Sequence, residues 1–451
     1  MKFLEHFLGL KKKGKGKNMQ LLREIGFFHG NILLFCVTTG AGIFVSPKGV
    51  FKYSSLNIAV SLSIWAACAI LTLITALSLA ELGTTFPRSG APYYFLKRSL
   101  GSSVAFLSLW IKLFIYPLGI ATQSLIITYI IQPFYTRCPA PEQPKKCLAL
   151  AILWSLGLLN TRGVLTVAWF QTISILVKMA VLCFISLTAI VQLGTGKKEN
   201  VARFENALDA EFLGALQIAE ALLQGLFAYA GTSILINIAD QSQTLLLFFL
   251  TFFLPMVAVI YILVNTSYLA VLTPQEIISA NAVAVTWMNK VFPSMEGVIS
   301  FGISTSIVSN TCCTVLSASR LFYTASQEGQ LPLINEYFSP TVATTQIIIL
   351  ASFLIIYSDL INLIKYSGLA TWVKRGLCMI GLLKLRYQDP NLPRPYNQDK
   401  NVRLPFVFGS IAVSLFLIMT PMIQSPKVEY IYGFIFIFSG LLCYWLHVHL
   451  N

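Results

Sequence analysis

The sequence contains few charged residues. Only 11% of its 451 residues are Asp, Glu, Lys or Arg, while 56% are hydrophobic. A soluble domain carries about 25% charged residues, so this chain has too few to cover a water-facing surface of its size. The apolar residues instead form blocks long enough to cross roughly 30 Å of hydrocarbon as helices. A soluble globular protein is therefore excluded.

Histidine and metal-ligand patterns are equally scarce. The chain has four histidines and nine cysteines, with no CxxC pair and no His/Cys cluster. Most of the cysteines fall within apolar blocks, where cysteine behaves as a small hydrophobic residue. No clustered catalytic set stands out either. We therefore expect no enzymatic activity, no cofactor and no metal site.

The apolar blocks predict the fold class. Lipid offers no hydrogen-bond partners, so each block must be a helix or part of a closed barrel, and continuous apolar runs favour helices. We predict an all-α polytopic membrane protein with a basic tail at 1–29 and one membrane domain at 30–449. The chain would cross the bilayer about twelve times, at residues 30–50, 57–80, 102–132, 147–162, 166–193, 212–238, 244–272, 297–323, 342–363, 366–386, 404–424 and 428–449.

The chain has a net charge of +14, and the positions of its basic residues indicate how it is oriented in the membrane. Seven of the 32 basic residues lie within residues 1–23, and five more lie within 384–403. Cytoplasmic segments of membrane proteins are enriched in Lys and Arg, so this pattern favours membrane orientation over nucleic-acid binding. We predict that both termini are cytoplasmic. The loop holding Cys138 then lies outside, where Cys138 could pair with Cys147 or with another chain.

The first predicted span contains a glycine-rich break. Its sequence over 38–49 is TTGAGIFVSPKG, and glycine leaves helical geometry readily. An unwound segment in mid-membrane exposes main-chain N–H groups, which suit a carboxylate, and carbonyl groups, which suit an ammonium. We predict that this break binds the main chain of an amino acid, through Thr39, Gly40, Ala41, Gly42 and Ile43.

The sixth span contains a second break. Its sequence over 225–233 is GLFAYAGTS, and the predicted site residues there are Phe227, Ala228, Tyr229 and Gly231. Two breaks five spans apart indicate inverted repeats, here near 30–193 and 212–386, with accessory helices at 404–449. The alternative is close helix packing through small residues.

Basic residues inside spans are further candidates. Lys178 lies deep in the fifth span, where a charge is costly unless it faces a cavity or a partner. It is predicted to supply a fixed cation, and snorkelling to the interface is the alternative. Lys112 in the third span is a possible contact for an anion. The loop after the second span carries four charged residues: Glu81, Arg88, Lys97 and Arg98. They could form a cytoplasmic gate, and the alternative is a positive loop that only orients the chain in the membrane.

The chain resembles the amino acid–polyamine–organocation transporters. Within them it is similar to the light-chain subunits of the heteromeric amino-acid transporters, in solute carrier family 7, and most of all to the renal aspartate and glutamate carriers linked to cystine. The resemblance rests on six segments: GAGIFVSPKG at 40–49, AELGTTFPRSGAPYYFLKRSLGS at 80–102, QPFYTRCPAPEQPKKCLAL at 132–150, KKENVARFENALDAE at 197–211, LVNTSYLAVLTPQEI at 263–277 and ASQEGQLPL at 325–333.

This resemblance implies a five-plus-five inverted-repeat core that exchanges amino acids without sodium. It implies that Phe227 gates the substrate, that Lys178 replaces sodium, and that Cys138 bonds a single-span glycoprotein heavy chain. It also implies a plasma-membrane location, at the apical face of an epithelial cell. Lys374 and Arg375 depart from the family, which usually has apolar residues there. A transport-silent chain with an assembly role is the alternative function.

Overall fold

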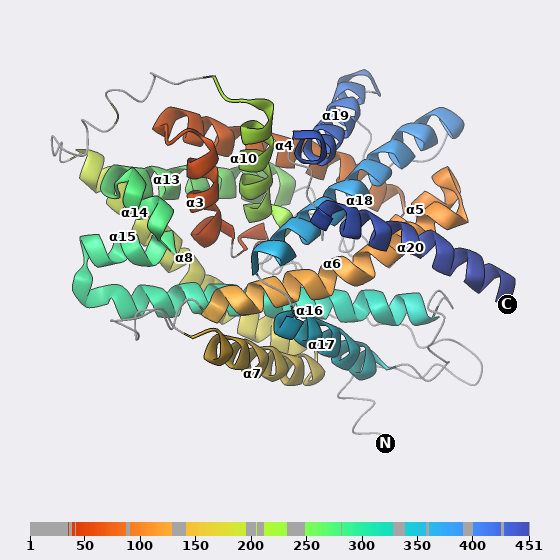
Figure 1. The fold of residues 1–451 in the computed structure, drawn as a ribbon, viewed down its shortest axis with the longest axis horizontal. Helices are drawn as coiled ribbons and strands as arrows, with labels where there is room; N and C mark the ends of the chain where they lie inside the picture. The colour runs from red at the N-terminus through yellow and green to blue at the C-terminus, as the bar shows by residue number, and fades with distance from the viewer. Residues whose placement is uncertain are drawn as a thin grey trace.

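The computed structural model describes most of the chain. The described residues are 35, 38–40, 42–86, 91–128, 141–194, 204, 212–231, 249–280, 282–327, 339–357, 360–390, 400–424 and 428–450. Within these ranges the regular structure is entirely helical, as Figure 1 shows.

The helices in chain order are α3 (Gly42–Tyr53), α4 (Ile58–Thr85), α5 (Ala91–Leu100), α6 (Ser102–Thr128), α7 (Glu142–Thr161), α8 (Val164–Gly194), α10 (Ala215–Ala228), η3 (Phe249–Phe253), α13 (Leu254–Val271), α14 (Pro274–Ser279), α15 (Val283–Val291), η4 (Pro293–Met295), α16 (Glu296–Gln327), α17 (Pro340–Tyr357), α18 (Leu360–Gln388), α19 (Lys400–Gln424) and α20 (Val428–Leu450).

Each predicted span overlaps at least one of these helices. Among the described residues, seven helices are long and apolar enough to cross a membrane: Ile58–Thr85, Ser102–Thr128, Thr166–Gln192, Phe249–Val271, Ser300–Tyr323, Pro340–Tyr357 and Leu404–Gln424. Two shorter apolar helices, Ala215–Ala228 and Gly433–Leu446, accompany them. The predicted class, an all-α multi-pass membrane protein, is confirmed.

Some helix boundaries differ from the prediction. The predicted ninth span ran to residue 363, but α17 ends at Tyr357 and α18 already begins at Leu360. The short helices α5, α14 and α15 were not predicted. Local capping explains α14, because the Thr273 hydroxyl accepts from the Glu276 N–H while the Glu276 carboxylate accepts from the Thr273 N–H.

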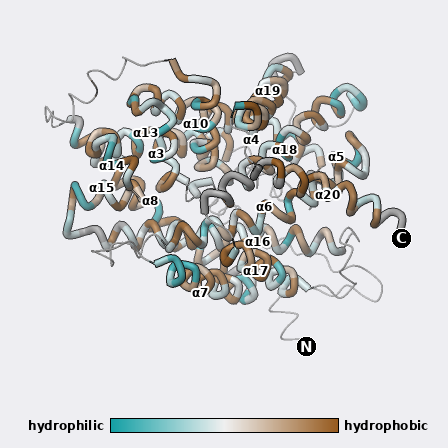
Figure 2. The backbone as a smooth tube through the Cα atoms, in the orientation of Figure 1, coloured by the Kyte–Doolittle hydropathy of each residue, from teal (hydrophilic) through white to brown (hydrophobic). Residues whose placement is uncertain are grey.

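The surface of the bundle is widely apolar. Figure 2 shows hydrophobic segments along most of the helices, including those at the periphery. Large apolar side chains are exposed on α8, where Leu176 is 67% exposed, and on α17, where Phe353 is 59% exposed. Soluble proteins rarely expose such extended apolar surface. These faces are suited to lipid.

The two helix breaks lie together in the interior. Thr38 is helical, the chain bends at Thr39, and α3 begins at Gly42, so the first predicted break is confirmed. The helix α10 ends at Ala228, within the second predicted break. In Figure 1 α3 (red) and α10 (green) run side by side, and they are in direct contact.

Candidate functional site

The closest approach of the two breaks is at Gly42 and Ala228. A Cβ atom added to Gly42 would lie 2.3 Å from the Ala228 Cα and 2.7 Å from its nitrogen. No side chain fits at that distance from another backbone. Gly42 is therefore required by the contact with α10, in addition to any freedom that it gives the unwound chain.

A cavity opens beside this contact. Its volume is about 190 Å³, whereas a single water needs roughly 10–15 Å³ measured in the same way. The cavity can therefore hold a small organic molecule. Both breaks border it, together with residues of α6, α16, α18 and α19. The predicted site residues among its lining are Gly40, Gly42, Phe227, Ala228 and Gly231.

Lys178 contacts the first break directly. Its side chain is fully buried, and its ammonium donates to the main-chain carbonyl of Thr39 at 2.6 Å. That carbonyl lies where the helix is interrupted, so it cannot rely on an intact helical turn for its partner. The side chain of Lys178, on α8, therefore points to the break in the interior of the bundle and not to an interface.

Tyr261 links the two breaks and was missed by the sequence analysis. Its hydroxyl lies 3.2 Å from the Ala228 carbonyl and 3.4 Å from the Thr38 carbonyl. A hydroxyl has one proton to donate, so the two carbonyls share it. A tyrosine deep in the apolar span α13 was the available signal, because a buried phenol requires a polar partner.

Tyr229 does not border the cavity. Its ring packs 4.9 Å from the ring of Tyr261 and 6.3 Å from that of Trp65, centroid to centroid, and its side chain is buried. Thr39 and Ile43 are also buried behind the cavity wall. Their predicted contact with a substrate would therefore be through the main chain or through a rearrangement.

Residues outside the two breaks also line the cavity. Arg375 and Trp372 of α18 line it, together with Asn310 and Thr314 of α16. Lys112 does not line it. Lys112 is buried on α6, which packs against α18. The sequence analysis noted Arg375 as a departure from a family and missed its place in the cavity.

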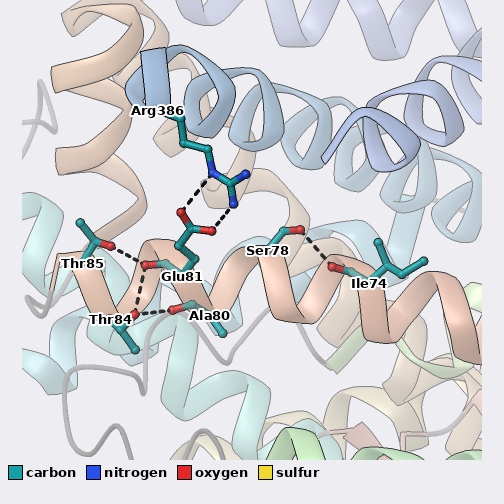
Figure 3. Close-up of polar contacts among 7 residues, drawn as sticks. All are labelled: Ile74, Ser78, Ala80, Glu81, Thr84, Thr85 and Arg386. Atoms are coloured by element: carbon teal, nitrogen blue, oxygen red, sulfur yellow. Dashed lines mark hydrogen bonds and ion pairs between the residues drawn. The ribbon is translucent and has the colours of Figure 1, made fainter. Parts of the chain in front are cut away.

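Two ion pairs join the C-terminal end of α18, and Asp389 directly after it, to neighbouring helices. The Arg386 guanidinium donates from Nε and Nη2 to the two carboxylate oxygens of Glu81 on α4, as Figure 3 shows. Both side chains are buried, at 10% and 5% exposure. A more exposed pair joins Arg98 of α5 to Asp389 at 2.8 Å. Of the predicted gate residues, Glu81 and Arg98 thus bind to the end of α18.

Three predicted residues fall where the structure gives no description. Ala41, Cys138 and Arg88 lie outside the described residues. Cys147, the predicted alternative partner of Cys138, is an exposed free cysteine at the start of α7 within the described part.

The fold and the cavity define a class. Two interrupted helices that border one cavity, in a multi-pass membrane protein whose described residues are helical, are the arrangement typical of membrane transporters. Residues 25–446 match the family model for amino acid permeases. The chain therefore belongs to the amino acid permease family and, within it, to solute carrier family 7, as the following relatives show.

The chain is 57% identical to solute carrier family 7 member 12 of Mus musculus, over 96% of this chain and 94% of the relative. It is 46% identical to solute carrier family 7 member 13 of Homo sapiens, over 96% and 93%. It is 32% identical to the human b(0,+)-type amino acid transporter 1, over 96% and 89%. These relatives are carriers, so the chain belongs to a family of transporters and not of enzymes.

Proposed function

We propose that this protein exchanges amino acids across the plasma membrane, without sodium, by alternating access. The observation that carries the proposal is the contact between the two breaks. Gly42 and Ala228 touch, and both border one cavity. The N-terminal end of α3 and the C-terminal end of α10 therefore face the same space.

The opposite polarity of these helix ends suits a zwitterion. The first N–H groups of α3 and the last carbonyl groups of α10 have no partner within their helices. The helix dipoles add partial positive charge at the start of α3 and partial negative charge at the end of α10. The α-carboxylate of an amino acid would bind at the former and its α-ammonium at the latter. The predicted main-chain contacts at Gly40, Ala41 and Gly42 belong to this arrangement.

Lys178 takes the place of a sodium ion in this proposal. A carrier that uses sodium must bind the cation again in each cycle, whereas an ammonium held on α8 is always present. The 2.6 Å contact with the Thr39 carbonyl supports this role. Phe227, which lines the cavity, is proposed as the aromatic gate over the substrate.

The proposed substrates are anionic amino acids, aspartate and glutamate, and cystine. The cavity is lined by the cation Arg375 of α18 as well as by Glu220 of α10, and Arg375 supports the binding of a negatively charged side chain. The alternative is a transport-silent chain with an assembly role. It would bind its partner yet carry no flux.

The proposed assembly is a heterodimer. The chain would act as the light chain, bonded through Cys138 to a single-span glycoprotein heavy chain. Both termini would be cytoplasmic, and the complex would lie in the apical membrane of an epithelial cell. The basic residues of the N-terminal tail support this orientation.

Counterflow in proteoliposomes tests the transport proposal. Purified protein is reconstituted with internal unlabelled amino acid, and uptake of labelled aspartate, glutamate, cystine and neutral amino acids is measured in sodium and in choline buffer. We expect uptake that requires internal substrate and is equal in both buffers. Uptake only in sodium, or none for any amino acid, would contradict the proposal.

A pair of glycine variants localises the site. Gly42→Val should abolish counterflow, because its side chain collides with the Ala228 backbone. Gly409→Val on α19 is the matched control, since a Cβ there meets no atom within 4 Å. Because a side chain at Gly42 strains the contact with α10, the amount of folded, reconstituted protein is measured for both variants and counterflow is compared per reconstituted molecule. Full activity of Gly42→Val would place the amino-acid site elsewhere.

A further inference from the structure

Arg375 is a buried cation facing the cavity. It is 5% exposed and borders the cavity together with Trp372. Its guanidinium carbon lies 4.8 Å from the centre of the Trp372 ring. Its Nε is buried with no hydrogen-bond partner in the described part of the chain.

The charge of Arg375 is not neutralised by any carboxylate that the structure describes. None of the ion pairs found among the described residues includes Arg375. A buried charge without a partner is costly in a membrane. A guanidinium remains protonated in proteins, so it cannot lose its charge as a buried lysine can. Stacking on Trp372 compensates only in part.

A second residue that lines the cavity also has an unsatisfied polar atom. The Oδ1 atom of Asn310, on α16, is buried without a hydrogen-bond partner among the described residues, and Asn310 also lines the cavity. Its amide can present either its oxygen or its NH₂ group, because the two ends are exchanged by rotation. Two unsatisfied polar groups bordering one cavity indicate a place for a polar ligand group.

These groups come from other helices than the two that carry the breaks. Arg375 and Trp372 come from α18 and Asn310 from α16, whereas the breaks come from α3 and α10. A substrate whose main chain occupies the breaks leaves Arg375, Trp372 and Asn310 to contact its side chain. The group that best satisfies a guanidinium is a carboxylate, which accepts two parallel hydrogen bonds.

We propose that Arg375, held on Trp372 and assisted by Asn310, is the specificity residue that binds the side-chain carboxylate of an acidic amino acid. The inference rests on the proposed exchange function and deepens it. It assigns to Arg375 the anion contact that the sequence analysis gave to Lys112. Lys374 is adjacent in sequence but does not line the cavity.

Isosteric substrate pairs provide the test. Counterflow in proteoliposomes is measured for aspartate against asparagine and glutamate against glutamine, with wild type, Arg375→Gln, Arg375→Lys and Lys374→Met. The wild type should prefer the acids.

Arg375→Gln should lower the acid-to-amide ratio by about 10- to 100-fold, the effect of a hydrogen bond to a charged group. Arg375→Lys should retain part of the preference, since lysine lacks the planar fork. Lys374→Met should keep the wild-type ratio.

A binding measurement covers variants that reconstitute poorly. The thermal midpoint of detergent-purified protein is measured with and without aspartate and asparagine. Aspartate should raise the midpoint of wild type and Lys374→Met and lose this effect in Arg375→Gln. If wild type shows neither flux nor stabilisation with any amino acid, the exchange proposal and this inference both fail. Stabilisation by aspartate without flux, lost in Arg375→Gln, supports the subsite in a transport-silent protein.

Two outcomes overturn the subsite alone. In the first, the wild type exchanges neutral amino acids and does not prefer acids. In the second, Arg375→Gln keeps the wild-type ratio in flux and in thermal stabilisation. In both cases amino-acid exchange stands, and the carboxylate contact is wrong.

Discussion

Single polar side chains hold the interrupted main chain in place. An unwound segment inside a bundle has carbonyl groups without helical partners, and leaving one buried and unsatisfied costs about 1–3 kcal/mol. Lys178 donates a hydrogen bond to the Thr39 carbonyl, and the Tyr261 hydroxyl donates to the carbonyls of Thr38 and Ala228. The break is therefore stabilised by groups from α8 and α13.

The hydroxyl of Tyr261 provides a clean test at this scale. Tyr261→Phe keeps the ring and removes the donor, so we expect a loss of about 1–3 kcal/mol in the free energy of unfolding, measured by thermal or denaturant unfolding in detergent. Tyr268→Phe is the matched control on the same helix, because the buried Tyr268 hydroxyl has no partner in the described part of the chain. It should be neutral or stabilising. Equal effects of the two variants would contradict the bridging role of Tyr261.

At the scale of elements, α18 has two functions in one helix. Arg375 and Trp372 in its middle face the cavity, and Arg386 near its end binds Glu81 of α4. The neighbouring Asp389 binds Arg98 of α5. A helix that borders the cavity is thus fixed to α4 and α5 at one end.

The buried ion pair should contribute far more than the exposed one. Removing one partner of a buried pair costs about 3–5 kcal/mol, because the remaining charge is left unpaired. Glu81→Gln should therefore strongly lower the free energy of unfolding. Arg98→Gln, which removes a pair that is 49% and 38% exposed, should cost about 0–1 kcal/mol. Comparable losses in denaturant unfolding would show that α18 is not anchored through Glu81.

For the molecule as a whole, the proposed disulfide at Cys138 predicts covalent assembly with another chain. Cys138→Ser should abolish a reducible high-mass band on a non-reducing gel of the surface protein, because the proposed intersubunit disulfide cannot form. Cys147→Ser is the control, since Cys147 is an exposed free cysteine in the described residues. Its band should be unchanged. Loss of the band only in Cys147→Ser would assign the disulfide to the other cysteine.

The fold class and both helix breaks could be predicted from the sequence. Long apolar runs must form helices in lipid whatever their neighbours are, because the main chain has no other hydrogen-bond partners there. The glycines near residues 40 and 225–231 weaken a helix locally, so the breaks follow from composition. The family could be recognised from the sequence as well, because the motifs that carry the resemblance are contiguous segments of the chain.

Only the tertiary structure decided which side chains meet at the cavity. Tyr261 contacts Thr38, which is 223 positions away in the chain, and Arg386 contacts Glu81 across 305 positions. Lys112 and Arg375 are both buried basic residues, and no pattern in the sequence distinguishes which of the two borders the cavity. That choice depends on how α6 and α18 are rotated in the packed bundle, and the rotation is set by contacts along the whole length of both helices.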